Sequence, residues 1–272
     1  MRRERERESK KAFTLAEILI TLAIVGIVAA STIPAVVTNL QRQEYVTRLQ
    51  KAYNTLTTAV QAAEAQRGPV AYWPPSISGS TLELTRQYIN PHLSITADCG
   101  SGTVPTAGNS CFAGSYKNLA GNTITSTNFL YYELFANLGA DRIMTSDGIS
   151  FAISTDIEVP VLQNPDNKAV EQRYILVDVN GPKPPNQLGR DLFVFTLHTS
   201  ESPGTVSLTT GHTRPQRRGV VPFGTYTSNT SNVGDKNLRD GSSGFGCNSA
   251  NTNINSGGYC AAKVLAEGAM NY

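Results

Sequence analysis

A single carboxylate, Glu17, stands near the front of an apolar stretch that continues without another charged residue to Leu40. Placing a charged side chain in lipid is unfavourable by a few kcal/mol on insertion scales unless a partner neutralises it. Glu17 therefore needs a cationic partner, unless its side chain reaches out to the lipid headgroups. The chemistry expected of this residue is charge pairing in an apolar environment.

A second group of polar side chains lies in the segment VDVNGPKPPNQLGRD and consists of Asp178, Asn180, Asn186 and Asp191. Carboxylate and amide oxygens are ligands that calcium prefers. The spacing differs from that of an EF-hand, which needs a glutamate at its twelfth position. The alternative is that these residues form Asx turns and a hairpin loop. Calcium, held by Asp178, Asn180 and Asp191, is the only cofactor that the sequence suggests.

The sequence contains none of the common local motifs of catalytic sites. It has no Gly-x-Ser-x-Gly elbow, no P-loop and no His-Glu-x-x-His pattern. The three histidines, at positions 92, 198 and 212, are scattered and isolated. We therefore expect the protein not to be an enzyme.

The net charge of +2 comes from the first twelve residues. They hold six of the 23 basic and three of the 21 acidic side chains, which leaves 17 basic and 18 acidic side chains, a net charge of −1, in the rest. A broad nucleic-acid surface is therefore not expected. The one compact basic group of the body, Arg214, Arg217 and Arg218, fits a solvated loop, with contact to DNA phosphates as the alternative.

The apolar stretch is long enough to cross a membrane. Residues 13–37 form a run of 25 residues, which as a helix extends for about 37 Å, against about 30 Å for a hydrocarbon core. The basic residues before it should stay in the cytoplasm, and the chain after Leu40 should be exported. Two ordinary interpretations are an uncleaved anchor and a secretory signal peptide cut after the small residues at 28–30.

The pattern resembles a third kind of segment, the signal of type IV pilins and type II secretion pseudopilins. The resemblance lies in a short basic leader, in Phe13, Thr14 and Leu15 directly behind the expected cut, in Glu17 as the fifth mature residue and in Pro34 as the twenty-second. The family usually has glycine just before the cut, where this chain has Ala12. The resemblance is strong over residues 10–37.

The resemblance implies processing, assembly and several partners. A prepilin peptidase would cut between Ala12 and Phe13, and Phe13 would become N-methylated. The new amine would then meet the Glu17 carboxylate of a neighbouring pilin subunit, and Pro34 would loosen the helix. An inner-membrane assembly platform is a further expected partner. Some pseudopilins bind calcium in a loop of the sheet domain, so the resemblance also favours Asp178, Asn180 and Asp191 as calcium ligands.

The elements that carry these residues follow from periodicity. An apolar stripe at spacings of three and four continues the helix beyond Pro34 to residue 67, where Gly68 and Pro69 end it, and consists of Val46, Leu49, Tyr53, Leu56, Val60 and Ala63. Strands are expected at 142–145 and 149–154 around an Asp-Gly turn, and at 174–179 and 192–197. Residues 69–128 and 199–258 are rich in Gly, Ser, Thr and Asn and are expected to be mostly loops, with a short helix from a capping box at Ser80 and Glu83 to about Tyr88.

The predicted fold is α+β: a long N-terminal helix, half transmembrane and half amphipathic, packed on a small antiparallel sheet. The predicted parts are a cleaved leader (1–12), a transmembrane or filament-core helix (13–38), an amphipathic helix (39–67) and an exported globular domain (68–272). The expected location is the bacterial inner membrane, single-pass, with the globular domain outside the cytoplasm and then a surface or periplasmic filament.

Four cysteines occur as two local pairs in these loops, Cys99 with Cys111 and Cys247 with Cys260. Outside the cytoplasm they should form two disulfides, each contributing about 3 kcal/mol in the chain-entropy model. Four cysteines allow three pairings, and adjacency favours the local one. Free buried thiols are the alternative.

Three functions remain open on the sequence. The first is a structural subunit, a prepilin or pseudopilin, that polymerises through its N-terminal helix. The second is a monomeric membrane-anchored module that binds calcium, glycan or DNA outside the cytoplasm. The third is a secreted protein with a conventional signal peptide. Adhesion, motility, DNA uptake and secretion are not distinguished.

Overall fold

The computed structural model describes residues 14–74, 81–100, 111–128, 130, 140–154, 172–198, 204–207, 212–216, 219–225, 227–228, 236–242 and 244–272. The chain divides into two compact units, residues 1–41 and residues 42–272. The predicted cleavage site, Ala12 and Phe13, and two residues of the basic group, Arg217 and Arg218, lie outside the described residues.

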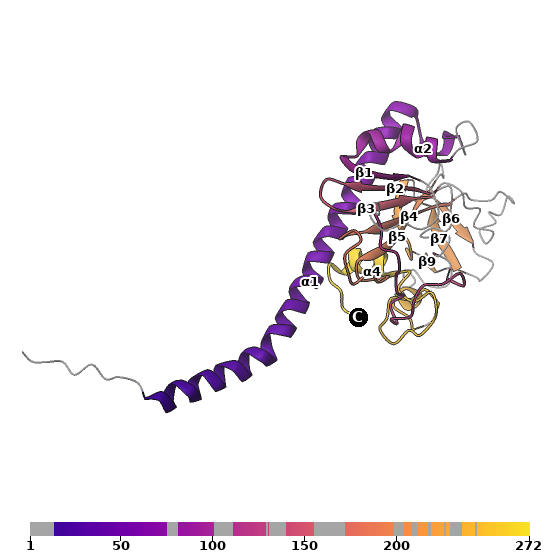
Figure 1. Ribbon diagram of the computed structural model, residues 1–272. Helices are drawn as coiled ribbons and strands as arrows, with labels where there is room; N and C mark the ends of the chain where they lie inside the picture. The colour runs from indigo at the N-terminus through magenta and orange to yellow at the C-terminus, as the bar shows by residue number, and fades with distance from the viewer. Residues whose placement is uncertain are drawn as a thin grey trace, which may run out of the picture. The chain divides into compact units, whose positions relative to one another are not determined.

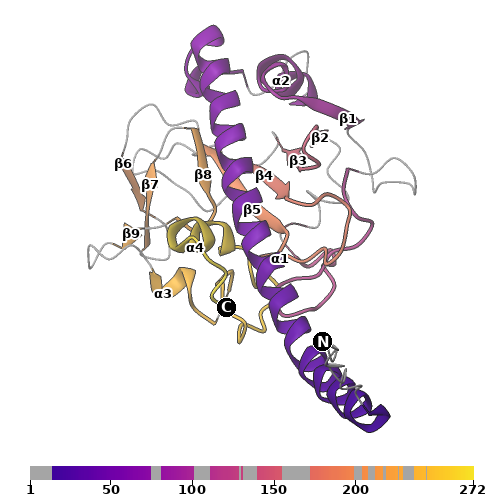
Figure 2. The same cartoon turned by 90° about the vertical axis from the view of Figure 1, so that its left-hand side faces the viewer.

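A single helix, α1 (Leu15–Arg67), contributes to both units. In the second unit its residues 42–67 cross one face of a sheet (Figures 1 and 2). The predicted apolar stripe is the face that this part of the helix buries, and its members Leu49, Leu56 and Ala63 are completely inaccessible. Tyr53 is half-buried and stacks on Phe195, with ring centroids 5.8 Å apart.

The sheet of the second unit has six strands in the order β1-β2-β3-β4-β5-β8, and all its neighbours are antiparallel. Its strands are β1 (Ile95–Gly100), β2 (Asp141–Thr145), β3 (Ser150–Ile153), β4 (Gln172–Asp178), β5 (Leu192–His198) and β8 (Gly219–Pro222). Both predicted hairpins are present, because β2 pairs with β3 and β4 pairs with β5. The α+β prediction is confirmed.

The central strands are buried on both faces. On β4, Ile175 and Val177 belong to the core under α1, whereas Leu176 belongs to a second core on the opposite face. The second core includes Phe112 and Tyr116. Both belong to residues 111–128, a segment of loops and turns that covers that face and is called the loop layer below. This two-sided burial explains why β4 and β5 are continuous apolar runs rather than alternating ones.

Several strands lie in segments that the composition predicted as loops. The edge strands β1 and β8 were missed, as was a second sheet with the order β6-β7-β9. The strands of that sheet are β6 (Gly204–Ser207), β7 (His212–Gln216) and β9 (Thr227–Ser228). These strands are short and carry Ser, Thr, Gly or Pro, so their pairing depends on neighbours rather than on intrinsic preference.

Short helices and two disulfides complete the second unit. The helices are η1 (Val70–Tyr72), α2 (Thr81–Tyr88), η2 (Asn90–His92), α3 (Lys236–Arg239) and α4 (Cys260–Glu267). Disulfides join Cys99 to Cys111 and Cys247 to Cys260, the local pairing that adjacency favours. The first ties the edge strand β1 to the loop layer, and the second ties the loop 240–259 to the first residue of α4.

Candidate processing and assembly site

Thr14 and Glu17 form a capping box at the first turn of α1. The Thr14 backbone N–H and hydroxyl both donate to Glu17 Oε2, at 2.8 and 2.9 Å, and the Glu17 N–H donates to the Thr14 hydroxyl at 3.2 Å. Such a reciprocal arrangement satisfies N–H groups that a helix start leaves without partners. Thr14 was not among the predicted assembly residues, although the sequence Thr-Leu-Ala-Glu at 14–17 has the spacing of this motif.

The part of α1 in the first unit exposes its apolar side chains on all sides. The exposed large side chains are Leu15, Ile18, Leu19, Ile20, Leu22, Ile24, Val25, Ile27, Val28, Ile33, Val36, Val37 and Leu40. Among the described helices, α1 alone is long and apolar enough to span a membrane. A surface of this extent requires cover from lipid or from other protein.

Pro34 lies inside the helix and does not end it. Proline has no backbone N–H, so the carbonyl of Ala30 loses its usual partner four residues ahead. The neighbouring hydroxyls bond to the helix itself: Thr32 donates to the Val28 carbonyl and Thr38 to the Pro34 carbonyl, both at 2.9 Å. The predicted loosening at Pro34 in an assembled filament stays a prediction.

The predicted metal ligands converge at the ends of β4 and β5. Asp178 and Asp191 are both completely buried. The Asp178 carboxylate accepts hydrogen bonds from the Tyr116 hydroxyl and from the backbone N–H of Asn180, the latter at 3.2 Å. The Asp191 carboxylate accepts from two successive backbone N–H groups, those of Asn186 and Gln187, at 2.7 and 2.6 Å.

Burial dominates the electrostatics of these two carboxyl groups. It raises the pKa of Asp178 well above the usual aspartate range, and the nearby Asp191 raises it further. Burial also raises the pKa of Asp191, against the lowering effect of its backbone hydrogen bonds. Two buried acids that repel each other favour either a shared proton or a cation between them.

The loop 179–191 contains further oxygens that fit a hard cation. The amide oxygens of Asn180 and Asn186 are buried and accept no hydrogen bond among the described residues. Two carboxylates and two amide oxygens are a suitable donor set for calcium. Within the described part of the chain, however, no group of three or more His, Cys, Asp or Glu side chains could hold a metal ion.

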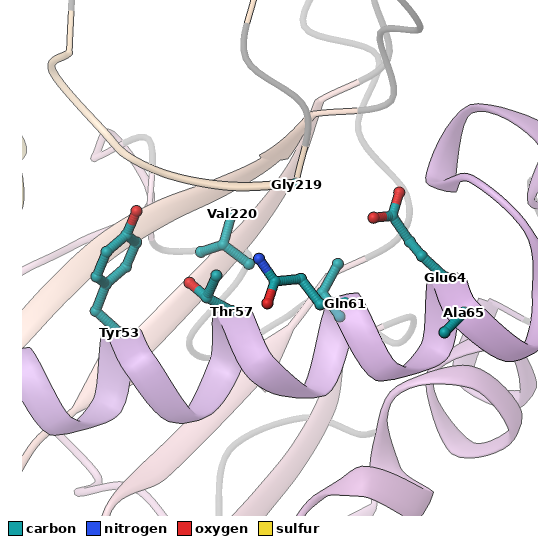
Figure 3. A pocket seen from close by; sticks show the side chains of 8 residues that line it. Tyr53, Thr57, Gln61, Glu64, Ala65, Gly219 and Val220 are labelled. Atoms are coloured by element: carbon teal, nitrogen blue, oxygen red, sulfur yellow. The ribbon is translucent and has the colours of Figure 1, made fainter.

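A pocket that the sequence did not predict lies between α1 and β8, within the second unit (Figure 3). Its volume is about 710 Å³, within the range of about 300–1,000 Å³ common for small-molecule sites. It is lined by Tyr53, Thr57, Val60, Gln61, Glu64, Ala65, Gly219 and Val220. The hydroxyl of Thr57 is buried and has no hydrogen-bond partner among the described residues.

Comparison with known families matches residues 7–33 to the prokaryotic N-terminal methylation motif. Comparisons with curated proteins and with solved structures give no match. The matched range contains the predicted cleavage site, the capping box and most of the exposed apolar surface. The chain thus carries a prepilin-type cleavage and methylation signal over residues 7–33, which is similar to the signal of type IV pilins and pseudopilins.

Proposed function

We propose that this chain is a structural subunit of a type IV pilus or a type II secretion pseudopilus. The observation that carries the proposal is the methylation motif at the front of a helix whose apolar residues from Leu15 to Leu40 are exposed and which continues into a folded unit. The exposed surface suits two successive environments, the inner membrane before assembly and the centre of a filament after it.

In this proposal a prepilin peptidase cuts between Ala12 and Phe13. The cut removes the basic leader and creates an ammonium group one residue before the capping box. The Glu17 carboxylate then pairs with the ammonium group of a neighbouring subunit, which offsets the desolvation of both charges. Within its own chain Glu17 already accepts from Thr14, so assembly would exchange or supplement those hydrogen bonds.

We also propose the division into four parts made from the sequence. Residues 1–12 are the leader, residues 13–38 the membrane and filament-core helix, residues 39–67 the amphipathic helix, and residues 68–272 the exported domain. The exposed apolar side chains up to Leu40 and the buried stripe that begins at Val46 support this order.

Co-expression with a prepilin peptidase tests the proposal. We expect intact mass and N-terminal sequencing to find N-methyl-Phe13, and an inactive peptidase to leave the full chain as the control. A mature start near Ser31 would instead identify a conventional signal peptide. An uncut, unmodified chain in the presence of active peptidase would contradict the proposal.

Glu17→Ala tests the assembly step separately. The variant should insert into the membrane as the parent chain does, because it removes a charge from an apolar helix. It should be absent from sheared filaments or from cross-linked oligomers. Normal assembly of Glu17→Ala would eliminate the proposed ion pair.

A membrane-anchored binding module is the second candidate, and the pocket favours it. Tyr53, Thr57 and Gln61 bring two hydroxyl groups and an amide to a cavity of small-molecule size (Figure 3). A module of this kind would remain monomeric in the membrane after processing. Analytical ultracentrifugation in detergent, combined with filament preparation from cells, separates the two candidates.

We further propose that the end of β4 and the loop 179–191 bind calcium through Asp178, Asn180 and Asp191. The buried acids and the unpaired amide oxygens among the described residues support this site. Calcium at millimolar concentration should raise the melting temperature, and Asp191→Ala should remove the increase. An unchanged melting temperature of the parent protein would rule out the site.

A further inference from the structure

Arg42 and Arg190 carry guanidinium groups that form no ion pair or hydrogen bond among the described residues. The Nε atom of each is buried and has no acceptor there. A buried charged donor without an acceptor is unfavourable, because it has given up its hydration without replacement. Each of these half-buried side chains therefore has a buried N–H group, at Nε, for which a ligand could supply the acceptor.

The two arginines come from different elements of the second unit that are packed against each other. Arg42 is the first residue of that unit on α1, and Arg190 lies in the loop between β4 and β5. The helix and the loop are in contact, since Arg48 Nη1 donates to the Val179 carbonyl at 3.2 Å. The Val179 N–H in turn donates to the carbonyl of Asp191, next to Arg190, at 2.9 Å.

Tyr272 lies where the helix and the loop meet. Its hydroxyl donates to the carbonyl of Gly189, the residue before Arg190. Its ring packs against the core that contains Val46, one helical turn after Arg42. Both ribbon views show the C-terminal end of the chain beside α1 (Figures 1 and 2).

The charges around the Tyr272 hydroxyl agree with this placement. Burial raises the pKa of Tyr272, and Arg190 and Arg42 each lower it, so both cations act on the same oxygen. Glu267 acts in the opposite direction. Its carboxylate is engaged elsewhere, with Lys263 at 2.9 Å and Arg239 at 3.3 Å.

We propose that Arg42 and Arg190 together bind a phosphate group, either the headgroup phosphate of a membrane phospholipid or free phosphate. A guanidinium group presents a planar fork of N–H donors that matches phosphate oxygens. Arg42 follows Leu40, the last exposed large apolar residue of the span, by two residues, or about 3 Å of helix. With the span in a bilayer, Arg42 lies at headgroup level, which favours the lipid. This site goes beyond subunit assembly and does not depend on it.

The test uses the full chain in a phosphate-free maltoside detergent. In one experiment inorganic phosphate is titrated at constant ionic strength. In the other phosphatidylglycerol is added, and diacylglycerol, which lacks the phosphate, is the control lipid. The readouts are the melting temperature and, for lipid, retention in native mass spectrometry. Arg42→Gln and Arg190→Gln remove one cation each, and Lys183→Gln removes an exposed cation of the same loop as the control.

We expect phosphatidylglycerol to raise the melting temperature and to be retained, and diacylglycerol to do neither. Each arginine variant should weaken binding about tenfold or more, whereas Lys183→Gln should not. Arg190→Lys should retain part of the binding and so distinguish ligand loss from misfolding. A response to inorganic phosphate alone supports the site with free phosphate as its ligand. Absence of both responses, or equal losses in the Lys183→Gln control, would overturn the proposal.

Discussion

The Thr14 hydroxyl links the processing site to the assembly residue. It both accepts from the Glu17 N–H and donates to the Glu17 carboxylate. Glu17 thus has a partner inside its own chain before any neighbouring subunit arrives. Glu17 stands out in the sequence because it is isolated in the apolar run, whereas Thr14 is neutral and its role depends on the geometry of the first helical turn.

Thr14→Val should weaken the first turn of α1. Valine keeps the branched shape but can neither accept from the Glu17 N–H nor donate to its carboxylate, and loss of such a cap is unfavourable by about 1 kcal/mol. In detergent micelles, hydrogen exchange at the amides of residues 15–17 should become faster. Thr14→Ser, which retains the hydroxyl, is the control and should exchange like the parent. Equal rates in Thr14→Val and the parent would show that the box contributes nothing.

Asp178 should make the second unit more stable at mildly acidic pH. Burial and Asp191 raise its pKa in the folded state, so the folded protein holds a proton that the unfolded chain releases. The stability that Asp178 contributes is therefore fully present below the usual aspartate value of about 4 and is lost as the pH rises through its folded pKa. The pKa values of Asp191 and Asp141 are also raised by burial and act in the same direction.

Asp178→Asn should flatten the decrease of melting temperature as the pH rises above the usual aspartate value of about 4, because the residue can no longer ionise. Calcium should be absent from the buffer so that only protons are measured. Asp98→Asn is the matched control, since the Asp98 side chain is half exposed and pairs with Arg86 at the surface. A pH profile of Asp178→Asn with the same slope as the parent would contradict this assignment.

Among the elements, those with strong local patterns were predicted and those that depend on neighbours were not. The helix to Arg67 and the hairpin strands β4 and β5 have clear periodicity or apolar content. The strand β1 has the sequence Ile-Thr-Ala-Asp-Cys-Gly and two irregularities in its register, and it is held by β2 on one side. The strand β8 has only four residues and is held in the sheet by its pairing with β5.

The buried acids could be named from the sequence, but their surroundings could not. Tyr116 is 62 positions before Asp178 in the chain, and its hydroxyl reaches that carboxylate only after the loop layer folds onto the sheet. The same holds for the pocket, in which Gly219 and Val220 meet residues of α1. Contacts between distant segments require the topology, which local patterns do not specify.

Gly189→Ala tests how the β4–β5 loop fits against α4. Gly189 has a φ of 82°, and a Cβ at this position would lie 2.6 Å from Cys260 Sγ, which is part of the disulfide. Both strain and a clash should result, with a loss of unfolding free energy of about 2–5 kcal/mol. Urea denaturation of the detergent-solubilised chain measures the loss.

Gly121→Ala is the matched control for Gly189→Ala. Gly121 has a similar φ of 89°, but a Cβ there would meet nothing within 4 Å. Only the backbone strain should remain, about 1–2 kcal/mol. Equal losses of unfolding free energy in the two variants would show that the clash with Cys260 does not affect stability.

At the scale of the whole molecule, the second unit contains both cores and both disulfides. The described residues of the first unit include no buried side chain. A fragment of residues 42–272, exported to an oxidising compartment, should therefore fold and melt cooperatively within a few degrees of the full chain in detergent. Circular dichroism during heating measures this.

A fragment of residues 54–272 is the control for the previous one. It lacks Val46, Leu49 and Ala52, of which the last two are completely buried. Removing a buried leucine side chain alone is unfavourable by about 2–5 kcal/mol, and this truncation removes more. Cooperative melting of residues 54–272 at the parent temperature would mean that the amphipathic stripe is dispensable.

The continuity of α1 has a mechanical consequence. Tension applied to an anchored end of the helix travels along its backbone into the folded unit, because no loop interrupts the helix between Leu15 and Arg67. We expect the weakest place along this path to be around Pro34, because proline lacks the backbone N–H of one helical hydrogen bond. Each residue that leaves the helix there lengthens the chain by about 2 Å. The helix around Pro34 would thus unfold first under tension, and the second unit with its disulfides would stay folded.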